Sequence, residues 1–304
     1  MSESSLRKEN AKLGFIGLGL MGSRFLRRLN AEGWDVRGWN RNKSATIPLR
    51  ENGYQVETTL ASLVDRSDVL LSSLADDSAV EGVYLGGDGV FAHVRPRTII
   101  LEMSTISPRL SAILHQETAA RGANLIDLAV SGSTPAVEAG AVTLFAGGDQ
   151  ETFVRCVPIF QSIAKQWFLM GPATAGTRMK LVVNLLLGIG MEAIAEAVSL
   201  GEHLALNRDL LLDVLPQTTV IAPAFSGKFS KIKTRDYSPQ FPLHLMSKDM
   251  NLAQSAADES GAELPAGRAA NDVFQKALAE SGELDISAIA AYVHTLSKLE
   301  VKGQ

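Results

Sequence analysis

The first half of the chain alternates short apolar runs with stretches in which apolar residues recur every three or four positions. Short apolar runs are typical of buried strands, and the periodic stretches are typical of amphipathic helices. Alternation of the two predicts β-α-β units and a mainly parallel sheet. The expected strands are 13–16, 35–40, 68–74, 98–104, 124–131, 141–149 and 165–171. Helices are expected from Met21 onward and at 44–53, 60–67 and 108–122.

The pattern changes after Pro172. From about Thr174 to Leu206 the periodicity is helical with almost no turn residues, and only helices, loops and helix-ending prolines follow. Polar side chains at Asn184, Glu192 and Glu196 interrupt this apolar helix and argue against a membrane span. We therefore predict an α/β protein with a doubly wound sheet. Its expected parts are a flexible tail (1–11), a sheet domain (12–173), a connecting helix (174–206) and an all-helical domain for substrate binding and dimerisation (207–304).

Glycines with the spacing G-x-G-x-x-G separate the first expected strand from the first helix. In a dinucleotide-binding turn, Gly17 makes the tight turn, Gly19 lets the backbone approach a pyrophosphate, and Gly22 lets the helix pack on the strand. The helix N-terminus that follows favours phosphates. The stretch predicts a Rossmann cofactor site that also includes Leu20 and Met21. A glycine-rich turn without a ligand is the plainer alternative.

Residues after the second expected strand predict which dinucleotide binds. An acidic residue at that position contacts the ribose 2′-hydroxyl of NAD. Here the position is Asn40, followed by Arg41 and Lys43. A guanidinium beside a neutral amide favours the 2′-phosphate of NADP over NAD. A solvated polar turn is the alternative.

Composition excludes several classes of function. With 29 Lys and Arg against 33 Asp and Glu, the chain carries a formal charge of −4, which argues against nucleic acid as its main partner. A single cysteine, Cys156, excludes an intramolecular disulfide and fits a buried residue in a reducing compartment. The five histidines show no metal-ligand spacing, so no metal is expected. The polar first eleven residues lack the apolar core of a secretory signal, and we expect a cytoplasmic protein.

Two polar residues stand out near the start of the long apolar helix. Lys180 and Asn184 are one turn apart and share one helix face among apolar neighbours. The plainer alternative is that Lys180 is a surface residue and that Asn184 is a polar residue tolerated in the packing of the helix. Their alignment favours a functional site.

With these residues in view, the chain resembles the β-hydroxyacid dehydrogenases, the family that includes 3-hydroxyisobutyrate dehydrogenase. Motifs similar to those of the family occur in order along nearly the whole chain. They read "GFIGLGLMG" (14–22), "EMSTISP" (102–108), "VSGS" (130–133), "GTRMKLVVN" (176–184) and "FPLHLMSKDMNLA" (241–253). Within the family, the chain looks most like the glyoxylate and succinic semialdehyde reductases, which use NADPH.

The resemblance implies a role for each motif. Lys180 would be the general acid that protonates a carbonyl oxygen, and Asn184 would hold the substrate or the lysine in line. A loop that binds the substrate carboxylate is implied for Ser131, Gly132 and Ser133. Residues that line the nicotinamide side are implied at Leu74, Ala75 and Thr105.

The same resemblance implies three further site residues near the C-terminus. Phe241 would close over the substrate and the nicotinamide, Lys248 would reach the cofactor or substrate, and Asp249 would brace the site. Phe241 and Lys248 would lie two helical turns apart if one helix runs through both. A core aromatic and a surface ion pair are the plainer alternatives.

Three departures from the family pattern weaken the choice of substrate. Ala75 stands where proline is common, "LAVSG" (128–132) replaces "APVSG", and Thr134-Pro135 replaces a lysine pair. We expect an NADPH-dependent reductase of small semialdehyde or 2-oxo carboxylic acids that forms a homodimer or homotetramer. Oxidation of a 3-hydroxyisobutyrate-type 3-hydroxyacid, an imine reductase-like activity and a non-catalytic dinucleotide-sensing module stay open as alternatives.

Overall fold

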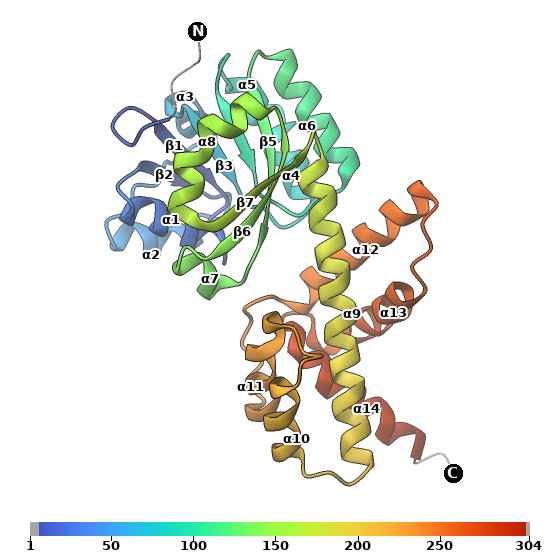
Figure 1. Ribbon diagram of the computed structural model, residues 1–304. Coiled ribbons are helices and arrows are strands. Elements are labelled where there is room, and N and C mark those ends of the chain that lie inside the picture. Colours follow the sequence, from blue (N-terminus) through green and yellow to red (C-terminus); the bar gives the residue numbers. More distant parts are fainter. Residues whose placement is uncertain (1–5, 302–304) are drawn as a thin grey trace. The chain divides into compact units, whose positions relative to one another are not determined.

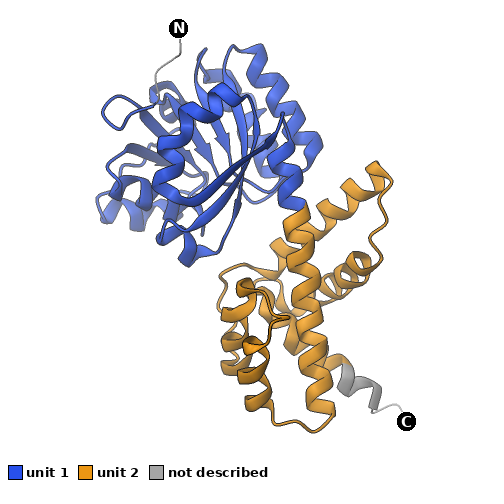
Figure 2. Cartoon of the chain, in the orientation of Figure 1, with its two compact units in different colours: residues 1–181 blue, residues 182–304 orange. Residues whose placement is uncertain are grey.

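The computed structural model describes residues 6–301, with backbone alone over 297–301. The chain divides into two compact units, Met1–Leu181 and Val182–Gln304 (Figure 2). The division falls inside one long helix, α9 (Ala175–His203). Each unit has its own apolar core.

The described part of the first unit is built around one seven-stranded sheet (Figure 1). Its spatial order is β2-β1-β3-β4-β5-β6-β7. Neighbouring strands are parallel except for β5 and β6, which are antiparallel. The strands are β1 (Lys12–Ile16), β2 (Asp35–Trp39), β3 (Val69–Ser72), β4 (Ile99–Glu102), β5 (Asn124–Ser131), β6 (Val142–Gly148) and β7 (Ala164–Gly171). The predicted parallel sheet is thereby confirmed.

Helices cover both faces of this sheet, because strand residues alternate between two cores. Val69 and Leu71 of β3 join a core that includes Phe25 and Phe160, whereas Leu70 joins the opposite core with Tyr84. A parallel sheet buried on both faces needs such continuous apolar strands. The helical elements are α1 (Gly22–Ala31), η1 (Lys43–Thr46), α2 (Ile47–Glu51), α3 (Leu60–Arg66), α4 (Asp77–Tyr84), α5 (Val90–His93), α6 (Pro108–Ala120), α7 (Thr134–Glu138) and α8 (Gln150–Ile163).

Helices α4, α5, α7 and α8 were not among the elements predicted from periodicity. α8 shows why, because it has Pro158 in its interior. Its local start signal was present, since Asp149 caps the helix by accepting a hydrogen bond from the Thr152 N–H at 2.8 Å. Capping therefore identifies this helix better than its apolar pattern does.

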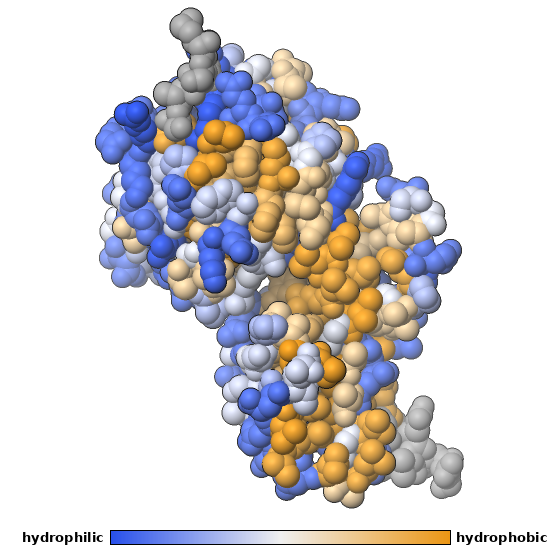
Figure 3. Space-filling model, viewed as in Figure 1, coloured by the Kyte–Doolittle hydropathy of each residue, from blue (hydrophilic) through white to orange (hydrophobic). Residues whose placement is uncertain are grey.

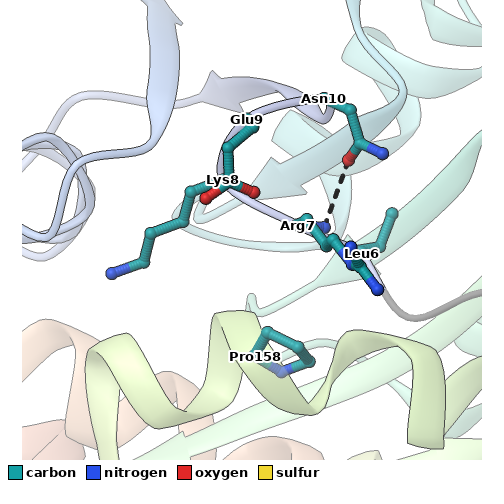
Figure 4. A pocket seen from close by; sticks show the side chains of 6 residues that line it. All are labelled: Leu6, Arg7, Lys8, Glu9, Asn10 and Pro158. Atoms are coloured by element: carbon teal, nitrogen blue, oxygen red, sulfur yellow. Dashed lines mark hydrogen bonds between the residues drawn. The ribbon is translucent and has the colours of Figure 1, made fainter.

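The predicted flexible tail is anchored at Leu6 and Ala11, and its residues 1–5 lie outside the described part of the chain. The Leu6 N–H donates to the Arg155 carbonyl at 3.3 Å, and Ala11 is buried. Arg7 N–H donates to Asn10 Oδ1 at 3.3 Å, which closes a turn over α8 (Figure 4). This turn and Pro158 line an open depression of about 670 Å³. Leu6 and Ala11 are therefore packed on the sheet unit, and residues 7–10 between them are exposed.

The second unit is all-helical, as predicted. The part of α9 that follows Leu181 contributes to an apolar core with residues such as Met191, Phe229 and Phe274. Its other elements are α10 (Arg208–Val214), η2 (Leu215–Gln217), η3 (Pro223–Phe225), α11 (Ser226–Thr234), α12 (Leu243–Ser260), α13 (Pro265–Ser281), η4 (Ile286–Ala288) and α14 (Ile289–Val301).

Among the described residues, α9 is the one helix long and apolar enough to cross a membrane, by length and composition alone. In its most apolar window 39% of the residues are buried inside the protein. It supplies apolar residues to the core of the second unit and carries Asn184, Glu192 and Glu196. One side of α9 therefore contributes to the core of the second unit, and the rest of the apolar window is not buried inside the protein.

A buried carboxylate fixes the start of α9. Asp127, in the middle of β5, accepts hydrogen bonds from the N–H groups of Thr174 at 2.9 Å and Thr177 at 2.8 Å. His115 Nε2 of α6 lies 2.8 Å from Asp127 Oδ1. The side chain satisfies N–H groups that a helix start leaves unpaired, and its charge complements the helix dipole. Thr174 adopts a left-handed conformation with φ of +73°, which these contacts hold in place.

We predict that Asp127→Ala destabilises the sheet unit by about 2–4 kcal/mol, because buried N–H groups lose their acceptor. Asp149→Ala is the matched control, since Asp149 also caps a helix but is exposed. That change should lower the free energy of unfolding by about 1 kcal/mol. Chemical unfolding followed by circular dichroism measures both. Equal losses in the two variants would contradict the special role of the buried cap.

Candidate functional site

The glycine loop between β1 and α1 is required by close packing. Gly17 has φ of +88°, and a Cβ on it would lie 2.3 Å from the Ser73 carbonyl oxygen after β3. A Cβ on Gly22 would lie 1.8 Å from the Gly17 carbonyl oxygen. Neither position accommodates a side chain, so the loop and the first turn of α1 lie directly against each other and against the end of β3.

Gly19 differs, because a Cβ there would meet no described atom within 4 Å. The residue is exposed, and the neighbouring Leu20 is 42% exposed. Met21 is the N-cap residue of α1. Free space over Gly19, beside a helix start, is what a pyrophosphate needs in order to approach backbone N–H groups. The residues of this loop therefore fit a dinucleotide.

Asn40 holds the glycine loop in place. Its Oδ1 accepts from the Leu18 N–H at 3.0 Å, and its Nδ2 donates to the Asn42 carbonyl at 2.9 Å. These bonds give its amide a bracing role that the sequence analysis did not assign. Arg41 and Lys43 are exposed on the same turn. Both side chains were predicted to contact the adenosine end of the cofactor.

Residues predicted on the nicotinamide side follow β3 and β4. The Leu74 N–H donates to Ser104 Oγ at 2.8 Å, so the loops after these strands are joined next to Thr105. Ala75 is exposed beside them. In doubly wound sheets, ligands bind at the carboxyl ends of the strands where the strand order reverses, here between β1 and β3.

Lys180 lies beside the predicted carboxylate loop. Its Nζ donates to the Val130 carbonyl oxygen at 2.7 Å, directly before Ser131, Gly132 and Ser133. Ser131 is the last residue of β5, Gly132 has φ of +152°, and Ser133 is the N-cap residue of α7. The structure therefore brings the ammonium group and the serine loop together at one strand end.

Close backbone packing keeps the helix that carries Lys180 in position. A Cβ on Gly176 would lie 2.4 Å from both the Asp127 and Phe145 carbonyl oxygens. The first turn of α9 therefore rests on β5 and β6 without a side chain between them. Asp127 and Gly176 were not recognised from the sequence, although Gly176 belongs to the motif quoted above.

In the second unit, predicted site residues form a polar cluster. Asn184 and Asp249 are buried, and Asn184 Nδ2 donates to Asp249 Oδ2. Lys248 Nζ lies 2.9 Å from Asp249 Oδ1. Asp249 therefore orients the Asn184 amide, as a bracing residue would.

Phe241 does not share a helix with Lys248, so the two-turn spacing considered for a continuous helix does not apply. α12 begins at Leu243 with Pro242 as its N-cap residue, so Phe241 lies in the preceding loop. The fixed backbone angle and missing N–H of proline make it a common start to a helix. Phe241 packs against the core of the second unit.

A buried ion pair that the sequence did not reveal positions this loop. Asp285 Oδ2 accepts from the Gln240 and Phe241 N–H groups at 3.0 and 3.1 Å, and Lys228 Nζ lies 2.8 Å from both carboxylate oxygens. Burial raises the pKa of Asp285, but the Lys228 bond and charge hold it below its ordinary value overall. The pair therefore stays charged and fixes the backbone at Phe241.

Other sequence-based expectations concern metals and the cysteine. Among residues 6–296, whose side chains are described, no group of three or more His, Cys, Asp or Glu side chains is placed to hold a metal ion. Cys156 is a buried free thiol whose pKa burial raises to about 12. It is therefore a packing residue.

Two family models together match most of the chain. The NAD binding domain of 6-phosphogluconate dehydrogenase matches residues 12–171. The NAD-binding domain of NADP-dependent 3-hydroxyisobutyrate dehydrogenase matches residues 174–293. The two matches meet just before α9 begins.

Individual relatives agree with these models. Glyoxylate/succinic semialdehyde reductase 1 of Arabidopsis thaliana is 32% identical over 91% of this chain and 96% of its own. NAD-dependent L-serine dehydrogenase of Pseudomonas aeruginosa is also 32% identical, over 91% of this chain and 96% of its own. A solved structure of 3-hydroxyisobutyrate dehydrogenase from Mycobacterium tuberculosis with L-serine has a TM-score of 0.83 at 30% identity, covering 94% of this chain and 99% of its own. With its glycine loop, its Lys180 on α9 in contact with the end of β5, and these matches over most of its length, the chain belongs to the β-hydroxyacid dehydrogenase family of NAD(P)-dependent oxidoreductases.

Proposed function

We propose that the protein reduces small semialdehyde or 2-oxo carboxylic acids to hydroxy acids with NADPH. The observation that carries the proposal is the 2.7 Å contact between Lys180 Nζ and the Val130 carbonyl oxygen. This contact supports a proton-donor role for Lys180, because the hydroxyl and N–H groups of the Ser131–Ser133 loop that follows Val130 suit a carboxylate. A substrate with its carboxylate near its carbonyl group fits such a pair of sites.

Each side chain has a separate task in this reaction. A bound nicotinamide dinucleotide supplies hydride to the carbonyl carbon or accepts it in reverse. Lys180 as an ammonium donates a proton to the carbonyl oxygen, and as a neutral amine it removes one from the hydroxyl group in the oxidative direction. The Ser131–Ser133 loop holds the carboxylate, which orients the carbonyl group toward the lysine. Asn184, one helical turn from Lys180, holds the substrate or the lysine in line.

Oxidation of a 3-hydroxyacid is the second candidate function. One relative is a dehydrogenase of L-serine, and L-serine is bound in a structural relative. L-Serine carries its hydroxyl group on the third carbon, so the same lysine and carboxylate loop would serve. Retention of Lys180 beside Ser131 supports carbonyl chemistry over imine reduction, and over a non-catalytic dinucleotide sensor.

The preference for NADP rests on Arg41 and Lys43. Since Asn40 already braces the glycine loop, the exposed guanidinium and ammonium groups remain as the groups to meet a 2′-phosphate. Relatives differ in this property, because the L-serine dehydrogenase is named as NAD-dependent. The free buried thiol of Cys156 is consistent with the cytoplasmic location that we propose.

We also propose that a second copy of the chain covers an apolar stripe on α9. Leu186 and Leu200 on α9 are 67% and 61% exposed, and Leu204, directly after the helix end, is 66% exposed. Between them lie exposed Ala193 and Ala197, which allow another helix to approach closely. Figure 3 shows apolar surface along α9 in this unit. A stripe that long is typical of an interaction surface, and the same stripe on a second copy is complementary to it.

Replacement of Lys180 tests the function. We expect Lys180→Met to lower kcat by roughly 10²–10⁴, because the proton donor is lost while helix propensity and most of the volume remain. Steady-state rates would be measured with glyoxylate and succinic semialdehyde under NADPH, and with L-serine and 3-hydroxyisobutyrate under NADP⁺ and NAD⁺. Lys165→Met, which removes an exposed lysine of β7, should leave kcat unchanged. A Lys180→Met enzyme that keeps more than about a tenth of wild-type kcat would show that another group is the acid.

Replacement of Arg41 tests the cofactor preference. Arg41→Ala should lower kcat/KM for NADPH by roughly tenfold to a hundredfold, the effect of losing a charged hydrogen bond. The value for NADH should barely change. Arg27→Ala, at an exposed position of α1, is the control and should affect neither cofactor. Wild-type protein that prefers NADH at equal concentrations would overturn the assignment.

Charged substitutions on the stripe test the assembly. Wild-type protein is expected to have the mass of a dimer or tetramer by light scattering, and Leu186→Glu with Leu200→Glu should shift it toward the 32.5 kDa of one chain. Val154→Glu, at a 53% exposed position on α8, should leave the mass unchanged. A monomeric wild-type protein would rule out the proposed contact.

A further inference from the structure

A buried carboxyl group lies next to the candidate cofactor site, at the start of the "EMSTISP" motif, and has been given no role above. Glu102 is the last residue of β4 and is 2% exposed. It stands in register with Ser72 on β3 and Asp127 on β5. A carboxylate in such a place needs several hydrogen-bond donors, because its desolvation is unfavourable.

Those donors come from the ends of two strands. The Ser104 N–H donates to Glu102 Oε1 at 3.0 Å and to Oε2 at 3.1 Å. The Ser104 side chain also hydrogen-bonds the carboxyl group. Ser72 Oγ donates to Oε1 at 3.2 Å. The carboxylate is therefore hydrogen-bonded both to the end of β3 and to the loop after β4.

This cluster reaches the residues proposed to line the nicotinamide. Ser104 Oγ accepts the Leu74 N–H at 2.8 Å, and Thr105 follows Ser104 directly in the chain. A hydrogen-bonded path thus runs from Glu102 through Ser104 to Leu74. When Glu102 is ionised, it can accept every donor pointed at it. Once protonated, it carries a hydrogen that competes with those donors.

The surroundings allow this group to change charge near neutral pH. Burial raises the pKa of Glu102 to about 7, opposed by its hydrogen bonds from Ser104 and Ser72 and assisted by the charge of Asp127. Tyr84 of α4 bonds Ser72 Oγ at 2.6 Å and has a pKa raised by burial, so it stays neutral. His115 of α6 lies next to Asp127, the β5 residue in register with Glu102, with its Nε2 2.8 Å from Asp127 Oδ1. These are the titratable groups that face the cluster from the elements around it.

We propose that Glu102 is a positioning residue: its ionised side chain holds the loops after β3 and β4, through Ser104, in the arrangement that binds the nicotinamide half of the cofactor. The inference rests on the proposed cofactor site and adds a pH-dependent control of its nicotinamide side. Protonation of Glu102 loosens Leu74 and Thr105 and weakens binding of the whole dinucleotide. The adenosine side, held by the glycine loop and Asn40, keeps its affinity.

Comparison of two ligands distinguishes binding of the nicotinamide half from binding of the adenosine half. Affinity of the ligand-free protein for NADP⁺ and for 2′-phospho-ADP-ribose, which lacks the nicotinamide, would be measured by calorimetry at about pH 6 and pH 8.5, on either side of the Glu102 pKa of about 7. The second ligand corrects for titration of the 2′-phosphate itself, whose pKa is about 6. We expect NADP⁺ to lose roughly tenfold more affinity than the fragment at the lower pH, the effect of one hydrogen bond to a charged group.

Variants test whether Glu102 is the source. Glu102→Gln keeps the volume and removes the charge, so NADP⁺ should bind roughly tenfold more weakly at pH 8.5 with no extra pH dependence. Binding of the fragment should match wild type. Glu117→Gln on α6, which loses only a surface ion pair with Arg121, is the control and should behave as wild type in both assays.

A thermal measurement separates positioning from simple stabilisation. Because burial raises the pKa of Glu102, its ionised form weakens folding above about pH 7, and glutamine should not lower Tm at pH 8.5. Retained Tm with weakened NADP⁺ binding supports the proposal. Unchanged NADP⁺ binding in Glu102→Gln, or equal losses for both ligands, overturns it. Wild-type protein that binds neither ligand would instead contradict the proposed NADP site.

Discussion

The structure of the candidate site depends on one buried carboxylate and the start of one helix. Asp127 is 1% exposed and accepts two N–H groups from the beginning of α9, with His115 on its outer side. Burying a carboxylate is unfavourable unless it is hydrogen-bonded, and here two backbone N–H groups and the His115 ring contact its oxygens. The helix start gains acceptors for groups that would otherwise be unpaired. Because Lys180 lies three residues beyond Thr177, this contact determines where the proposed acid is placed.

The other parts of the first unit converge on the same edge of the sheet. The loops after β1 and β3 meet at Gly17 and Ser73, with no room for a side chain between them. The loops after β3 and β4 meet through Ser104. At the end of β5, Lys180 meets Val130. Parallel strands bring all their carboxyl ends to one edge, so residues from many parts of the chain can surround one ligand there.

Buried polar pairs perform a comparable task in the second unit. Asn184 is oriented by Asp249, and the backbone at Phe241 is held by Asp285 and Lys228. Breaking the Lys228–Asp285 ion pair would leave an uncompensated buried charge, so each of these two residues depends on the other. The side chains that the family resemblance points to are therefore supported by residues with no direct part in the chemistry.

Local patterns in the sequence identified most of the fold and the residues of the proposed chemistry. Strands and the long helix were evident because side-chain periodicity is a local property, and the glycines because tight turns restrict the backbone. Lys180 and Asn184 were found because helical geometry aligns residues four apart. A proline inside α8 obscured that helix, and Pro242 ended the assumed continuity from Phe241 to Lys248.

Only the tertiary structure decided which polar groups support the site. Asp127 meets Thr174 and Thr177 across 47 and 50 positions, and Asp285 meets Lys228 across 57. Asn40 likewise reaches the glycine loop across 22 positions. Nothing in the local sequence distinguishes these side chains from exposed polar residues of the same type. Their partners come within hydrogen-bonding distance only when the sheet and the helical core have formed, so sequence periodicity carries no signal for them.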